Sequence, residues 1–115
     1  MVPETETRTH ELGEILKVVD ESVRMLNHVS SGEEQKLART VSEKVEWSLD
    51  RLANRDWLEL HMQLHELVYY LDLACFSLMN LNGESFHVYL QEVNQRYRTL
   101  LRKLYVMYSR TGIRQ

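Results

Sequence analysis

Residues 57 to 81 read WLELHMQLHELVYYLDLACFSLMNL, and this stretch constrains the fold more than any other part of the chain. It contains no proline or glycine, which favours one helix of about seven turns. One set of its apolar residues recurs at alternating spacings of three and four, the period of a helix that packs lengthwise against a neighbour. The members of this seam are Trp57, Leu60, Leu64, Leu67, Leu71, Ala74, Leu78 and Leu81.

A second stripe lies on the opposite side of the same helix. Its members are Met62, His65, Tyr69, Leu73 and Phe76. A helix that is apolar on two sides is normally buried on two sides, whereas each helix of a four-helix square has an outward face that should be polar. We therefore expect one of three arrangements: this helix is central within one chain, its second stripe contacts a second copy, or the stripe contacts a different protein.

The rest of the chain also reads as helix. It has 115 residues with one proline and four glycines, which suits a single helical domain better than a turn-rich β fold. Apolar periodicity predicts helices over 9–29, 32–53, 57–81 and 84–110. Four helices of this length with short connections predict an all-α, up-down antiparallel four-helix bundle, with a long hairpin formed by its third and fourth helices.

The domain is expected to cover residues 9–111, between a disordered tail at 1–8 and a short tail at 112–115. Three local signals mark the connections. The spacing of Ser31 and Glu34 predicts a capping box, Asp56 and Glu59 repeat it, and Gly83 is expected to close the third helix in the left-handed conformation.

Three apolar stripes should meet the seam of the third helix in the core. They are Leu12, Ile15, Leu16, Val19, Val23 and Leu26 in the first helix; Leu37, Ala38, Val41, Val45, Leu49 and Leu52 in the second; and Phe86, Leu90, Val93, Tyr97, Leu100, Leu104 and Met107 in the fourth.

Charge is distributed unevenly along the chain. Residues 1–93 carry 8 Lys and Arg against 17 Asp and Glu, whereas residues 94–115 carry six cations and no acid. Cations near a helix C-terminus interact favourably with the helix dipole, but six exceed that need. Arg98, Arg102 and Lys103 are therefore candidates for orienting an acidic partner.

The single cysteine, Cys75, excludes an internal disulfide and suits a reducing, cytoplasmic setting. It lies in the apolar middle of the third helix, where an inert packing role is expected. The N-terminus has no cationic start followed by an apolar run, which argues against a secretory signal. The acids within 57–81 argue against a membrane span.

Histidines and arginines give two alternative readings. His61 and His65 stand one helical turn apart, a spacing that can hold one metal ion. Arg55, Asp56 and His61 fit an order of Arg, a polar residue and then His. This resembles the motif of the HEPN domains, a helical ribonuclease superfamily, and the resemblance implies that Arg55 and His61 from paired subunits activate a ribose hydroxyl.

The leading prediction is a non-enzymatic protein–protein interaction module: a small regulator, an adaptor or a chaperone, in the form of a homodimer and without a cofactor. Met62, Tyr69 and Phe76 are the expected anchors, with His65 and Leu73 between them. Trp47 lies off the stripe of its helix, and we expect either it or Tyr70 to border the binding surface. A HEPN-like ribonuclease and a helical metal or small-molecule sensor remain the alternatives.

Overall fold

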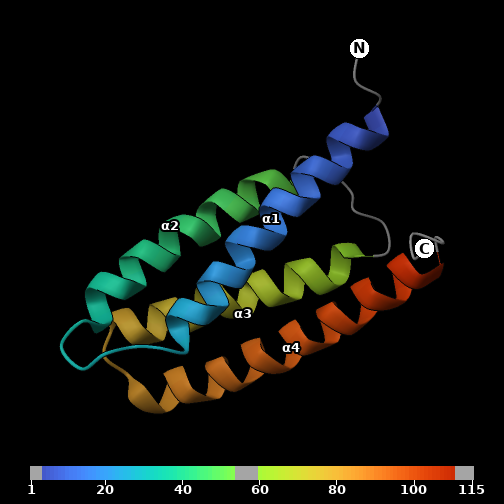
Figure 1. The fold of residues 1–115 in the computed structure, drawn as a ribbon. Coiled ribbons are helices and arrows are strands. Elements are labelled where there is room, and N and C mark those ends of the chain that lie inside the picture. Colours follow the sequence, from blue (N-terminus) through green and yellow to red (C-terminus); the bar gives the residue numbers. More distant parts are fainter. Residues whose placement is uncertain (1–3, 54–59, 111–115) are drawn as a thin grey trace.

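Four helices build the whole of the described chain, which comprises residues 4–53 and 60–110 of a computed structural model (Figure 1). They are α1 (Glu4–Leu26), α2 (Glu34–Ala53), α3 (His61–Met79) and α4 (Gly83–Arg110). The all-α prediction is confirmed, and the helices pack as a compact bundle.

Helix α3 has the two most extensive neighbours in the bundle. It packs along α4 on one side and along α2 on the other, while α1 packs mainly on α2 and has fewer contacts with α3 and α4. In the view of Figure 1, α3 accordingly lies between α2 and α4, behind α1. The side of α3 that is turned away from α1 has no further helix over it within the described chain.

The core consists of the predicted stripes. Ile15 and Val19 from α1, Val41 from α2 and Leu100 from α4 are buried against the α3 seam. Seven α3 side chains at its centre are at most 5 % exposed: Leu64, Leu67, Val68, Leu71, Ala74, Cys75 and Leu78. Leu90, Tyr97, Leu104 and Met107 of α4 pack at the edge of this core.

Two predicted core residues are at the surface. Leu49 is 36 % exposed, because it lies at the margin of the α2 stripe, and Leu81 is 63 % exposed, because α3 ends at Met79 and the seam ends with it. Trp57 belonged to the same predicted seam and lies outside the described residues.

The first two helices begin at other residues than predicted. Helix α1 starts at Glu4, five residues before the predicted start at Thr9. At α2, the carboxylate of Glu34 accepts a hydrogen bond of 2.8 Å from the N–H of Gly32, which replaces the predicted capping box with Ser31.

The turn between α3 and α4 also differs from the prediction. Leu81, not Gly83, takes the left-handed conformation, with φ of 55°. The N–H of Asn82 donates to the carbonyl of Ser77 at 2.9 Å, the pairing that closes a helix by a Schellman motif. The side chain of Asn82 then accepts from the N–H of Ser85 at 3.1 Å and caps α4. Asn82 therefore closes α3 through its backbone N–H and caps α4 through its side chain. The left-handed residue of this closure is Leu81, one position before Asn82.

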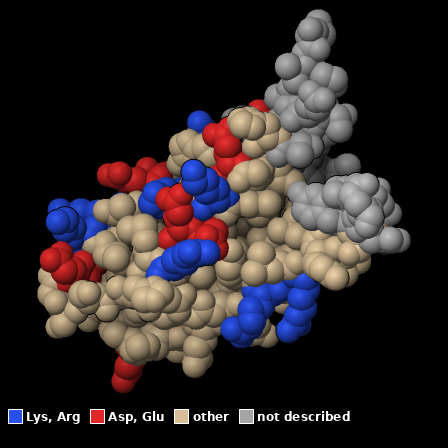
Figure 2. All heavy atoms as spheres, viewed as in Figure 1, with Lys and Arg blue, Asp and Glu red and all other residues tan. Residues whose placement is uncertain are grey.

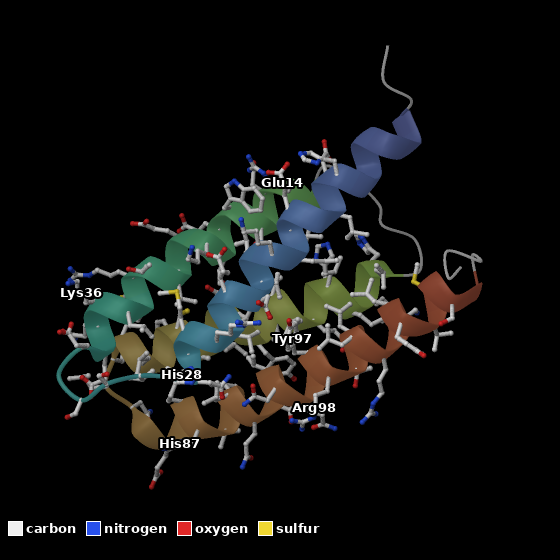
Figure 3. The ribbon with its side chains drawn as sticks, viewed as in Figure 1. Glu14, His28, Lys36, His87, Tyr97 and Arg98 are labelled. Carbon is white, nitrogen blue, oxygen red and sulfur yellow. The ribbon has the colours of Figure 1, made fainter. Side chains whose placement is uncertain are left out.

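Polar contacts hold α1 against α4. The hydroxyl of Tyr97 donates to the carboxylate of Asp20, and Figure 3 shows Tyr97 on the side of α4 that faces α1. Asn27 and Asn94 exchange two side-chain hydrogen bonds, at 2.9 and 3.0 Å. Burial, together with the bond to Asp20, raises the pKa of Tyr97 to about 12.

Candidate protein-binding surface on helix α3

A line of large apolar side chains runs along the uncovered side of α3. Met62 is 67 % exposed, Tyr69 is 58 % exposed and Phe76 is 71 % exposed. They are seven residues apart, so each lies almost directly above the previous one, and the line spans about 21 Å. Of the second stripe, His65 and Leu73 are half-buried between them. We call the five residues of the second stripe the α3 surface.

The helix pattern explains why these side chains stay in water. The inward arc of α3 is filled by Leu64, Leu67 and Leu71, each at most 1 % exposed, so the bundle is already packed on that side. Tyr69 and Phe76 point the opposite way. Exposed aromatic and methionine side chains in a continuous line are characteristic of protein contact surfaces.

The edge of the α3 surface next to α4 is held by Arg96. Its guanidinium contacts the carboxylate of Glu66 at 2.5 Å and that of Glu92 at 3.2 Å. The same group lies over the ring of Tyr70 at 4.5 Å. Tyr70 in turn meets the ring of Tyr69 edge-on at 5.4 Å. Tyr70 therefore borders the surface as a half-buried support for Tyr69.

The edge next to α2 carries the two histidines. Gln35 donates to the carbonyl of Met79 at 2.9 Å and so places this edge of α3 beside α2. The rings of His61 and His65 lie 4.3 Å apart at their centroids. Burial and the neighbouring His61 lower the pKa of His65, which favours its neutral ring. Asp72, on the same edge, is exposed.

Trp47 is partly buried on α2, with the guanidinium of Arg51 over its ring at 4.0 Å. Lys44, one turn earlier, reaches Glu21 of α1 at 3.0 Å. Since Lys44 and Trp47 are three residues apart, Trp47 lies toward the α1 side of α2, away from the α3 surface.

The basic residues of α4 that follow Arg96 differ in exposure. Arg98 and Arg102 are exposed and Lys103 is half-buried. Figure 2 shows Lys and Arg atoms gathered over this part of α4 without acidic atoms beside them, and Figure 3 shows Arg98 pointing away from the bundle. We call Arg98 and Arg102 the α4 basic pair.

Cys75 is suited to packing only. Its side chain is 2 % exposed, and burial with the nearby Asp72 raises the pKa of its thiol to about 12. A thiol that keeps its proton at neutral pH is a weak nucleophile.

The alternative metal site lies within the described chain, whereas the alternative ribonuclease site lies only partly within it. Within residues 4–53 and 60–110, no three His, Cys, Asp or Glu side chains are grouped to hold a metal ion, so His61 and His65 would supply only two ligands. Arg55 lies outside the described residues, and its relation to His61 stays a prediction.

Sequence reasoning missed two apolar residues near the ends of the α3 surface. Leu81 was assigned to the core, although the two asparagines around it, Asn80 and Asn82, were a signal that the helix ends there. Val88 of α4 is 58 % exposed, and no pattern in the sequence separates it from an ordinary surface valine.

Comparison of the chain with protein-family models, with curated proteins and with solved structures finds no match to any of them. Among the described helices, none combines the length and the apolar character needed to cross a membrane.

Proposed function

We propose that this protein is a non-enzymatic protein–protein interaction module, of the kind found in small regulators, adaptors and chaperones, and that the α3 surface is its binding surface. The observation that carries the proposal is the line of Met62, Tyr69 and Phe76, each more than half exposed on a helix whose opposite side is buried in the core. Placing such side chains in water forgoes burial worth about 1.5 to 3 kcal/mol each, which a bound protein would recover.

The proposal extends to the α4 basic pair. These two arginines have an acid-free stretch of helix around them, because the last acid of the chain is Glu92. Exposed charges of one sign mainly accelerate and orient association, and salt weakens their effect. The pair would therefore steer an acidic partner, while the α3 surface would supply the affinity.

The test compares two variants of equal charge change. Tyr69→Asp with Phe76→Asp places two charges on the α3 surface. Thr40→Asp with Gln91→Asp places two charges on exposed positions of α2 and α4 outside it. Both should fold, as judged by circular dichroism and thermal unfolding, since all four positions are exposed.

Association is then measured by sedimentation velocity, with the purified protein alone and with a protein that copurifies from its native cells at fixed stoichiometry. The α3 variant should lose complexes that the control variant keeps. Charge reversal of the α4 basic pair should lower the association rate and its salt dependence. Unfolding of the α3 variant, or complexes that persist in it, would remove the proposal.

A further inference from the structure

We infer that the partner of the α3 surface is a second copy of this chain, with the two α3 helices packed antiparallel about a two-fold axis at Tyr69. The inference rests on the proposed function, because it names the occupant of the same surface. Its basis is the self-complementary arrangement of size and charge along α3.

The spacing of the anchors is symmetric. Met62 and Phe76 stand seven residues before and after Tyr69, or about 10 Å along the axis in each direction. A two-fold axis perpendicular to α3 at Tyr69 therefore places Tyr69 against the Tyr69 of the copy, and Met62 against its Phe76. Sulfur–aromatic and offset aromatic contacts are both favourable pairings. Two-fold symmetry is also the commonest symmetry of soluble oligomers.

The edges of the surface agree with the same symmetry. His65 and Asp72 are seven residues apart, so they share the edge next to α2. The two-fold axis places the α2 edge of one chain beside the α2 edge of the copy. Along the helix axis, His65 then lies at nearly the same height as Asp72 of the copy. An exposed carboxylate thereby meets a histidine, whereas a parallel pairing would place Asp72 beside Leu73 of the copy. On the other edge, Glu66 already has Arg96 at 2.5 Å.

The exposed apolar area is small for a stable dimer. At the observed exposures, the three anchors offer about 400 Å² per chain, or about 800 Å² for two copies. Stable dimers usually bury about 1,200 to 2,000 Å² in total. The flanking helices add Leu49 of α2 and Val88 of α4, which are 36 % and 58 % exposed. A dimer that dissociates on dilution to micromolar concentration is therefore expected.

Val88 lies on the side of α4 that borders α3. It shares a row of that helix with Glu92 and Thr99, which line a shallow groove together with Glu66 of α3. Of the α4 basic pair, Arg98 lies on the outward side of the same helix, whereas Arg102 follows Thr99 by three residues and lies nearer to that row. The dimer therefore leaves Arg98 exposed to an acidic partner.

Single-cysteine cross-linking tests the pairing. Under mild oxidation at tens of micromolar, Tyr69→Cys should form a disulfide-linked dimer, because position 69 faces itself across the axis. Met62→Cys and Phe76→Cys should form one only when the two variants are mixed, since each lies about 21 Å from its own copy. The native Cys75 is buried and should not compete, and Gln91→Cys on the outer side of α4 is the matched control.

The combination of variants that cross-link distinguishes an antiparallel pair from a parallel pair. Cross-links of Met62→Cys and Phe76→Cys with themselves would indicate a parallel pair and overturn it. Loss of the Tyr69 ring could itself weaken the dimer, and the mixture of the other two variants keeps that ring in place. An absence of cross-links in the mixture, under conditions where the wild-type protein is dimeric, would place the dimer contact elsewhere and overturn the inference.

The failure of this inference differs from failure of the proposed function. A wild-type protein that is monomeric at 200 µM by light scattering overturns the dimer. If the same monomer binds a different purified protein, and Tyr69→Asp with Phe76→Asp abolishes that binding, the proposed function stands. If no complex depends on the α3 surface, both fall.

Discussion

The stability of Phe76→Ala, measured against that of Leu71→Ala, separates an exposed anchor from a core residue on the same helix. Phe76 is 71 % exposed, so folding removes only about 60 Å² of its surface from water, worth about 1.5 kcal/mol. The higher helix propensity of alanine returns about 0.5 kcal/mol. We therefore expect Phe76→Ala to lower the free energy of unfolding by about 1 kcal/mol. Leu71 is 1 % exposed, and Leu71→Ala should cost about 2 to 5 kcal/mol.

Urea unfolding followed by circular dichroism measures both values. At or below 1 µM protein, the free energies of unfolding of the two variants should fall by the amounts stated. The slope of the free energy of unfolding against urea concentration should be the same for both. At 100 µM the wild type should gain stability by mass action, and Phe76→Ala should lose that gain. Equal losses for Phe76→Ala and Leu71→Ala at low concentration would show that Phe76 is part of the core, and the reasoning about the α3 surface would be refuted.

Three further predictions concern titratable groups. Tyr97→Phe removes the bond to Asp20 and should lower the free energy of unfolding by about 1 kcal/mol. Because folding raises the pKa of Tyr97 from 10.0 to about 12, the wild type should lose this advantage over the variant between about pH 10 and pH 12, as measured by unfolding at each pH. Folding lowers the pKa of His65, so stability is complete above pH 6.5 and should fall below it, and His65→Gln should flatten that decline in a pH series of thermal unfolding. Cys75 should react with a thiol reagent at pH 8 only at the rate of unfolding; rapid labelling in the absence of denaturant would contradict its burial.

The sequence predicted the helices and the core well because both depend on periodicity. The α3 seam from Leu60 to Leu78 and the α4 positions Phe86, Val93 and Leu100 are buried as the spacing required. Apolar residues spaced three and four apart determine which side of a helix is buried, whichever element that side packs against. The same counting singled out Met62 and Tyr69 as excess apolar surface.

The ends of helices were less predictable, because a few hydrogen bonds decide them. Leu81 continues the spacing of the seam, but the Schellman closure at Asn82 ends the helix before it. The role of Tyr70 was also beyond the sequence. It depends on Arg96, 26 positions away, lying over its ring, and only the packing of α3 on α4 brings the two together.

The molar mass in solution tests the central claim most directly. Light scattering after size-exclusion chromatography, over 1 to 200 µM, should show the wild-type mass rising from one chain toward two. Tyr69→Asp with Phe76→Asp should stay at the mass of one folded chain throughout. A wild-type protein that remains a single chain at every concentration would contradict self-association through α3, as would a variant that dimerises equally well.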